Sequence, residues 1–231
     1  MKDLMRPGQN MAIFGKQNNS SAQKAKIEEL NMGTDKISVA LNKYADRFLM
    51  AEVKNFEGAA HKAYADMARR TLRIKENSKE RIALKKSATE ILRQAVEKLK
   101  NDPSDFPKWH EKSCNALIAC YGGQISYGQA QKWLNMLLKY LYVYDVKGYE
   151  TLFSSPERIT ALDMPVDSKV IEALHRKYNV KRPTAGWSVW DRNTYRAYQA
   201  AARSALQNIE NPDERVPFYW ELIHWSDVSA T

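Results

Sequence analysis

The sequence predicts an all-α protein, a compact multi-helix globular chain. Apolar residues recur at steps of three and four over much of its 231 residues, which is the spacing of one helix face. No run of Val, Ile and Thr alternates convincingly with polar residues, so strands are expected to be few or absent. The hydrophobic fraction of 44% is ordinary for a globular protein, and a chain of this length can bury a substantial core.

The polar N-terminal segment differs in composition from the rest of the chain. Residues 1–34 include the run Gln-Asn-Asn-Ser-Ser and are expected to form a flexible arm with a short helix near residues 22–30. Residues 35–231 are expected to form a helical domain, either as one unit or as two subdomains that meet near residues 101–126.

The first half of this domain predicts three helices. They are expected near residues 35–48, 56–74 and 78–100, where apolar side chains fall on one face. Ser78 is a residue type that accepts backbone hydrogen bonds at a helix N-terminus, so it is expected to cap the third helix. Asn101-Asp102-Pro103 ends that helix.

The second half predicts a central helix and several around it. A helix after Asp105 ends at Gly122-Gly123, and the next, from Tyr127 to about Tyr144, is apolar on most sides and therefore central. Short turns are expected over residues 145–163. The remaining helices are expected from Asp167 to about Tyr178, from Asp191 or Asn193 to about residue 208, and over residues 213–225, with a loop at 182–186.

The net charge of +9 is concentrated in one part of the chain. Residues 61–100 hold 12 Lys and Arg against 5 Asp and Glu. Such a field favours phosphate-bearing partners, and Arg69, Arg70 and Arg73 are the candidate DNA contacts within it. A solvated helix face that keeps the protein soluble explains the same charge equally well.

Other functional classes have little support in the sequence. Cys114 and Cys120 lie six residues apart in a predicted helix, which does not suit a disulfide, and no His or Cys stands near them at zinc-ligand spacing. We therefore expect two buried free cysteines, no metal and no cofactor. No apolar run has the roughly 18 residues of a membrane span, and Met1–Pro7 lacks the apolar core of a secretory signal, so a cytoplasmic location is expected.

Asp167 is the candidate catalytic residue. It follows Met164-Pro165-Val166 at a predicted helix start, where Pro165 stiffens the approach. Backbone N–H groups and the helix dipole favour the ionised carboxylate at this position. Such a group could stabilise a developing cation or orient a water molecule, or it could be an ordinary N-cap.

The turn before the central helix is the candidate phosphate site. Helix N-termini expose N–H groups that bind phosphate, and Gly128 lets a backbone come close. The candidate DNA-binding residues here are Ser126, Gly128, Gln129, Gln131 and Lys132. A plain loop-to-helix junction is the simpler interpretation.

Together, a glycine-bearing turn, an apolar helix and Pro-Val-Asp at a helix start resemble the helix-hairpin-helix DNA glycosylases over residues 126–178. The resemblance implies a helix-hairpin-helix-like element near residues 115–143 that grips DNA, with Asp167 acting on the sugar from which the base departs. Lys169 beside it is expected to contact DNA. The chain departs from the pattern because Ser126-Tyr127-Gly128 keeps only one of the two usual glycines, and the spacing from Gly128 to Asp167 is long.

The resemblance also bears on the reaction type. Bifunctional members of that superfamily carry a nucleophilic Lys two residues after the last hairpin glycine, and the matching position here is Ala130. This implies a monofunctional enzyme that uses water. A base taken out of the duplex needs a pocket with a stacking face, for which Trp109, His110, Tyr127 and Trp187 are the candidates, although large rings more commonly pack in cores.

Two functions from different classes follow. The first is a DNA-binding, monofunctional glycosylase that hydrolyses the N-glycosidic bond of a modified base through Asp167. The second is a non-enzymatic basic helical protein, an adaptor or inhibitor that engages nucleic acid or a protein partner. Recognition of a nucleotide ligand by basic and aromatic residues is a third, weaker interpretation.

Overall fold

The computed structural model describes residues 36–43, 53, 55–75 and 78–229, with side chains up to residue 224. All regular secondary structure in these ranges is helical, which confirms the all-α prediction. The predicted N-terminal arm, residues 1–34, lies outside the described residues, and so does the end of the first predicted helix, whose described part is the helical segment 36–43.

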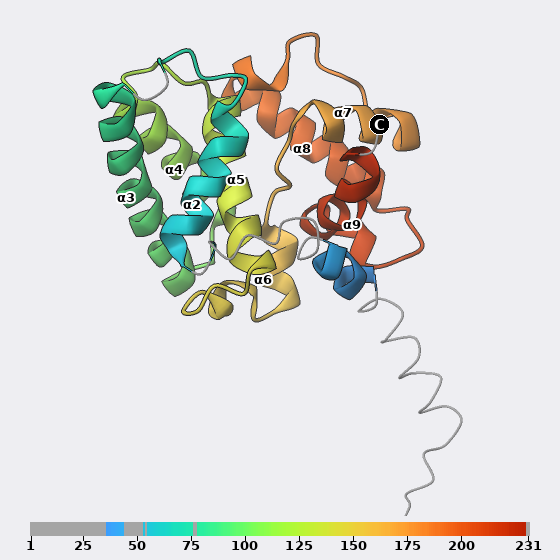
Figure 1. Ribbon diagram of the computed structural model, residues 1–231. Coiled ribbons are helices and arrows are strands. Elements are labelled where there is room, and N and C mark those ends of the chain that lie inside the picture. The colour runs from blue at the N-terminus through green and yellow to red at the C-terminus, as the bar shows by residue number, and fades with distance from the viewer. Residues whose placement is uncertain (1–35, 44–52, 54, 76–77, 230–231) are drawn as a thin grey trace, which may run out of the picture.

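The helices follow one another through short connections (Figure 1). They are α2 (Phe56–Ala68), α3 (Lys79–Asn101), α4 (Phe106–Cys120), α5 (Tyr127–Val143), α6 (Pro156–Ala161), α7 (Ser168–Tyr178), α8 (Arg192–Leu206) and α9 (Pro217–Ser229), with 3-10 helices η1 (Glu150–Phe153), η2 (Trp187–Val189) and η3 (Asp213–Arg215).

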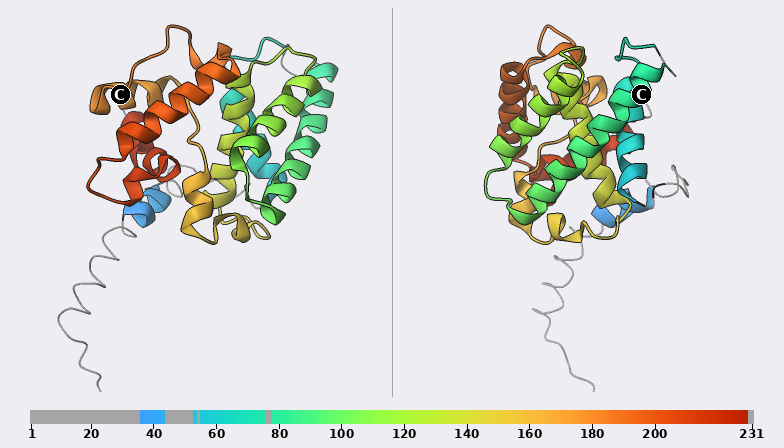
Figure 2. Two further views of the ribbon diagram at one scale, coloured as in Figure 1. Left: turned by 180° about the vertical axis from the view of Figure 1, so that it is seen from behind. Right: turned by 90° about the vertical axis from the view of Figure 1, so that its left-hand side faces the viewer.

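The helix α5 is central, as its all-round apolar sequence predicts. Every residue from Tyr127 to Leu141 is buried. The helices α2 and α4 pack against it, and α3 packs on α4 and α2. Figure 2 shows α7, α8 and α9 gathered on the other side of α5, which α8 and η2 contact directly. The fold therefore places α5 between two groups of helices.

One cluster of buried side chains joins the two groups. It runs in sequence from Val53 to Trp220 and includes residues on both sides of segment 101–126. This segment therefore does not separate two cores among the described residues. It contains α4 and the turn to α5, where Gly122 and Gly123 have φ of 56° and 80°, a conformation that side chains disfavour. The likeness of this helix pair to the glycosylase element stays a prediction.

Short polar side chains begin most of these helices. Asn55, Ser78, Asp105, Ser126 and Asp191 each accept a hydrogen bond from a backbone N–H in the first turn of the following helix. These contacts satisfy donors that have no partner inside the helix. The predicted cap at Ser78 is confirmed, and of the two predicted starts of α8, Asp191 or Asn193, the cap is Asp191.

Three element boundaries differ from the predictions. The helix α2 ends at Ala68 rather than near residue 74, because Gln129 Nε2 donates to Thr71 O at 3.0 Å and holds the following turn. The helix α6 lies in the segment predicted as turns, and Ser155 and Pro156 begin it. The last predicted helix is divided into η3 and α9 because Val216, which precedes a proline, is extended.

Candidate functional site

Asp167 is the N-cap of α7, as predicted, and its carboxylate accepts three hydrogen bonds. Its Oδ1 accepts hydrogen bonds from the backbone N–H groups of Lys169 and Val170, each at 3.0 Å. Its Oδ2 lies 2.8 Å from Lys132 Nζ on α5. The Asp167 side chain is 28% exposed and that of Lys132 is 5% exposed. The contact therefore joins α5 to α7 at the edge of the core.

The ion pair keeps both groups charged at neutral pH. Burial alone would raise the pKa of Asp167, but the Lys132 charge and its hydrogen bond outweigh it, so the pKa lies below its usual value. Burial likewise opposes the charge of Lys132, whereas Asp167 and Glu221 favour it and raise its pKa. The pair thus stabilises the contact between α5 and α7, and each carboxylate oxygen of Asp167 already accepts at least one hydrogen bond.

The N-terminus of α5 is covered by the segment that contains η2. Ser126 and Gln129 form a capping box, in which each side chain bonds the backbone N–H of the other residue. The N–H of Gly128 donates to Trp190 O at 3.0 Å. A Cβ on Gly128 would lie 1.8 Å from Trp187 O. The glycine is therefore required for a close backbone approach inside the protein.

This cover corrects the prediction of an exposed phosphate site at the turn. Gly128, Gln129, Gln131 and Lys132 are buried, and Ser126 Oγ donates to Ser188 O at 2.6 Å. Gln131 Nε2 donates to Gly128 O and Val166 O at 2.9 and 3.3 Å. A phosphate could reach these groups only if the segment 187–190 moved away.

The predicted base-pocket residues are packed rather than arranged around a cavity. His110 Nδ1 lies 3.2 Å from Tyr127 OH, and both residues are buried. Trp109 Nε1 donates to Ala95 O at 2.7 Å and so ties α4 to α3. Trp187 lies apart from them, against Gly128. The ring of Tyr195 stacks on His110 with centroids 5.2 Å apart and fills the face that a base would need. This corrects the expectation of an open pocket.

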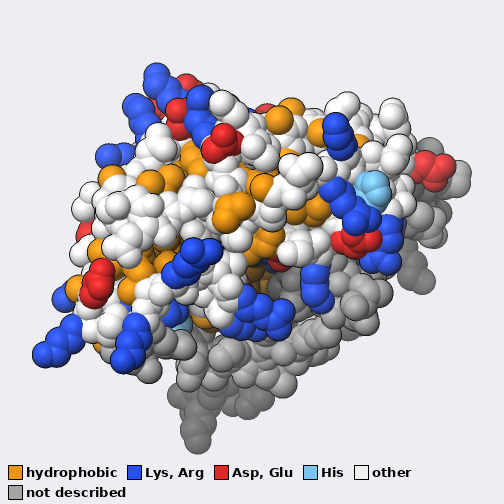
Figure 3. Space-filling model, turned by 90° about the horizontal axis from the view of Figure 1, so that it is seen from above, with side chains coloured by type: hydrophobic (Ala, Val, Ile, Leu, Met, Phe, Trp, Pro, Cys, Tyr) orange, Lys and Arg blue, Asp and Glu red, His pale blue; other side chains and the backbone are white. Residues whose placement is uncertain are grey.

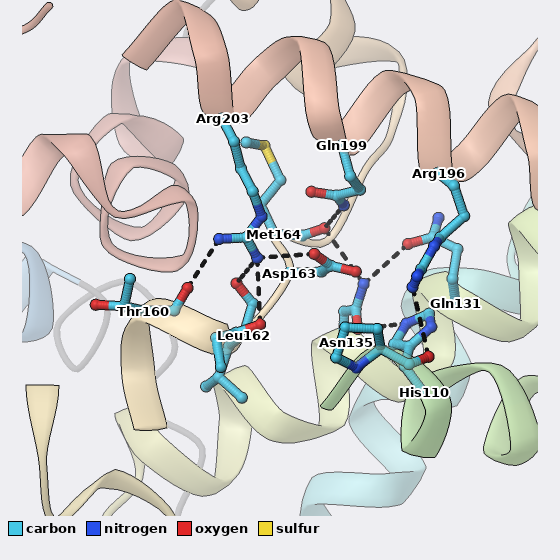
Figure 4. Close-up of polar contacts among 12 residues, drawn as sticks. His110, Gln131, Asn135, Thr160, Leu162, Asp163, Met164, Arg196, Gln199 and Arg203 are labelled. Carbon is cyan, nitrogen blue, oxygen red and sulfur yellow. Dashed lines mark hydrogen bonds and ion pairs between the residues drawn. The ribbon is translucent and has the colours of Figure 1, made fainter. Parts of the chain in front are cut away.

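The sequence interpretation missed a buried polar network between α5 and α8 (Figure 4). Asn135 and Tyr195 are its centre. Asn135 Nδ2 donates to Tyr195 OH at 2.9 Å, and Tyr195 OH donates to Asp163 Oδ2 at 2.8 Å. His110 Nε2 lies 3.1 Å from Asn135 Oδ1. Arg203 Nη2 closes the network 2.8 Å from Asp163 Oδ1.

The network also donates hydrogen bonds to backbone carbonyl groups of residues 162–166, the segment that leads into α7. Arg203 Nη2 donates to Leu162 O at 2.7 Å, and Gln199 Nε2 donates to Met164 O at 2.8 Å. Burial lowers the pKa of His110 and raises that of Tyr195 well above its usual value. Both are therefore neutral hydrogen-bonding groups at neutral pH. Their role in the described structure is to fix the path of residues 162–166 across α5 and α8.

The sequence does carry a signal for this network. Gln131, Lys132, Asn135 and Lys139 recur at helical steps within a segment that is otherwise apolar. All four are buried, and each makes a side-chain contact with another element or with a neighbour in the network. Polar residues at these steps indicate a buried polar stripe, because an unpaired polar group in a core is costly.

The basic candidates Arg69, Arg70 and Arg73 are exposed, near the turn between α2 and α3. No described acidic residue forms an ion pair with Arg70 or Arg73, and Arg69 makes only an exposed contact with Asp66 at 3.3 Å. Lys169 is also exposed, on α7. Figure 3 views the end of the molecule that carries this turn: Lys and Arg side chains stand at several separate places, with Asp and Glu beside some of them.

No group of three or more His, Cys, Asp and Glu side chains among the described residues is arranged to hold a metal ion. No helix in that part of the chain is both long and apolar enough to cross a membrane. Cys114 and Cys120 are free, as predicted, but only Cys114 is buried and Cys120 is partly exposed.

Comparison of the chain with protein-family models, with curated proteins and with solved structures gave no match.

Proposed function

We propose that this protein binds the phosphate backbone of DNA without catalysis, through the basic segment 69–86. The observation that carries the proposal is the charge of this segment, which holds eight Lys and Arg against two Glu. Arg70, Arg73, Lys75, Lys79 and Lys86 are exposed and form no ion pair with a described acidic residue. Such side chains attract phosphate without reading sequence.

The position of Asp167 supports a non-catalytic interpretation. Its two oxygens accept three hydrogen bonds from the protein, out of about four lone-pair positions on a carboxylate, so most of its accepting capacity is used within the fold. The polar side chains of the network around Asn135 and Tyr195 likewise form hydrogen bonds with one another. Asp167 and the α5 polar stripe then serve to hold α7 and the link before it.

The salt dependence of DNA binding tests the proposal. Fluorescence anisotropy with a labelled oligonucleotide, measured between about 50 and 200 mM salt, should show affinity falling steeply as salt rises. The triple variant Arg69→Gln, Arg70→Gln, Arg73→Gln should weaken binding and reduce the slope of log K against log salt by about one per lost phosphate contact.

A matched control removes the same charge elsewhere. Lys112, Lys147 and Lys181 are exposed on α4, on the turn after α5 and beyond α7, and the triple Lys-to-Gln variant lowers net charge equally. Equal loss of affinity in both triple variants would show that only net charge matters. Unchanged binding in the arginine variant would reject the assigned surface.

A second candidate function is the monofunctional DNA glycosylase. One observation favours it: the Lys132 charge and two backbone N–H groups keep Asp167 ionised while its side chain is 28% exposed. Incubation with DNAs that carry different modified bases, followed by alkali cleavage, would reveal abasic sites. Base release that is lost in Asp167→Asn would favour this candidate, and the absence of abasic sites from every substrate would favour the non-catalytic one.

A further inference from the structure

A surface hollow of about 430 Å³ lies between α2 and α3. His61, Tyr64 and Arg69 line it from α2 and the residue that follows α2, and Arg81 and Lys85 line it from α3. The described residues that line it include no Asp or Glu, although Arg69 also contacts Asp66 on α2 at 3.3 Å. A hollow of this size admits a small ligand, and its charged groups select an anion.

Arg81 is held in place before any ligand arrives. Its Nε donates to Tyr64 OH at 2.8 Å, and its Nη1 donates to Ile74 O at 3.0 Å. The guanidinium also lies over the Tyr64 ring, 5.6 Å from the centroid. Two of its five N–H donors are thus bonded to the protein, so donors on Nη1 and Nη2 remain to meet a ligand. Fixed donors lose less conformational freedom on binding than mobile ones do.

Lys85 and His61 form a second pair of groups at the hollow. Lys85 Nζ lies 2.5 Å from His61 Nδ1 and 5.1 Å from the centroid of the Tyr64 ring. This contact holds Lys85 Nζ beside the His61 ring at the hollow. Burial and the Arg81 charge lower the pKa of Lys85. A bound anion would oppose both effects, because an opposite charge favours the ammonium form.

We propose that this hollow binds a phosphate monoester, such as the 5′-phosphate at the end of a nucleic-acid strand. A monoester carries close to two negative charges and three terminal oxygens, whereas each backbone diester carries one charge. Arg81, Lys85 and Arg69 provide the opposing cations from two elements. The hollow is larger than one phosphate group and leaves room for the attached nucleoside.

The strand-end source rests on the proposed function, whereas the phosphate site itself does not. The full chain is titrated against two single-stranded oligonucleotides of one sequence, both labelled at the 3′ end, with a 5′-phosphate or a 5′-hydroxyl. The wild-type protein should bind the phosphorylated strand about tenfold more tightly, since hydrogen bonds between charged groups are strong. Lys85→Gln should abolish that difference, and Lys112→Gln should keep it.

The outcomes separate the two proposals. Equal affinity for both strands overturns the monoester site and leaves backbone binding intact. If neither strand binds, thermal unfolding with inorganic phosphate or a nucleoside 5′-monophosphate decides. A rise in Tm that Lys85→Gln removes would support the monoester site with a free nucleotide or phosphate as its ligand, whereas an unchanged Tm overturns it. The nucleoside monophosphate should also displace the phosphorylated strand, with an inhibition constant equal to the dissociation constant measured for the monophosphate itself.

Discussion

Lys139 on α5 and Glu221 on α9 form an ion pair inside the protein. Lys139 Nζ lies 2.8 Å from Glu221 Oε1 and 2.6 Å from Oε2, and each side chain is 1% exposed. The contact joins the central helix to the last helix in the chain, across a distance of 82 residues.

Removing one partner of this pair should destabilise the fold strongly. Glu221→Gln or Lys139→Met leaves a charge buried without its partner, which costs about 3 to 5 kcal/mol. Urea unfolding of each variant measures the free energy of unfolding. The double variant Lys139→Met, Glu221→Leu should recover much of the loss, since buried pairs are replaceable by apolar residues. A loss below about 1 kcal/mol in both single variants would contradict a desolvated pair.

Two substitutions of Asp167 should distinguish its contribution to stability as a helix cap from its contribution as the ion-pair partner of Lys132. Asn is a good N-cap, so Asp167→Asn removes the charge opposite Lys132 and keeps a capping oxygen. Asp167→Ala removes both and should cost about 1 kcal/mol more than Asp167→Asn. Urea unfolding at pH 7 compares the two. Equal stability of the Asn and Ala variants would show that the cap contributes nothing.

The same residue predicts a pH dependence. Because the folded-state pKa of Asp167 lies below its unfolded value, its stabilising contribution is present above the unfolded pKa of about 3.9 and is lost as pH falls through the folded pKa. The wild-type protein should therefore lose more unfolding free energy than Asp167→Asn between about pH 5 and pH 2. If the unfolding free energies of the two proteins fall in parallel as pH is lowered, Asp167 does not contribute to the acid destabilisation.

Gly128→Ala should destabilise the protein by forcing α5 and η2 apart. The new Cβ would lie 1.8 Å from Trp187 O, a backbone atom, and overpacking of this kind costs about 1 to 3 kcal/mol or more. Gly186→Ala is the matched control, because no atom lies within 4 Å of its Cβ position and its φ of −64° suits any residue. Guanidinium unfolding should show little change for that control. Equal losses would indicate a general effect of removing glycine from this region.

Two tyrosines on α8 test the polar network. Tyr195→Phe removes the hydroxyl that donates to Asp163 and accepts from Asn135, which should cost about 1 to 3 kcal/mol. The Tyr198 hydroxyl is buried with no partner among the described atoms, so Tyr198→Phe should be neutral or stabilising. Thermal unfolding of both variants gives the comparison, and a larger loss at Tyr198 than at Tyr195 would contradict the network.

The helices themselves follow from local features of the sequence. The apolar periodicity predicts α2, α3, α4, α5, α7 and α8 close to their observed positions, because one face of each helix must be buried. Ser78 and Asp167 are residue types that bond the first turn of a helix, and both cap as predicted. Asp191 caps α8, one of the two starts that the sequence left open. The short helix α6 was missed although Ser155 and Pro156 precede it, since a six-residue segment has little periodicity to detect.

The accessibility of the candidate site was not predictable from local sequence. The turn at Ser126–Gly128 has the residues of an exposed helix N-terminus, but Trp187, Ser188 and Trp190, about 60 residues away, cover it. The aromatic residues near His110 are packed by Tyr195 from α8. Contacts between distant segments decide whether a polar group faces solvent.

The sequence by itself therefore determined the helical class, the central place of α5, the caps and the excess of positive charge, because each depends on residue type and on spacing along one segment. Only the tertiary structure decided that Asp167 meets Lys132, that Gly128 lies against Trp187, and that Arg81 and Lys85 face one hollow. Each of these contacts joins elements whose relative positions depend on packing of the whole core, which no single segment encodes.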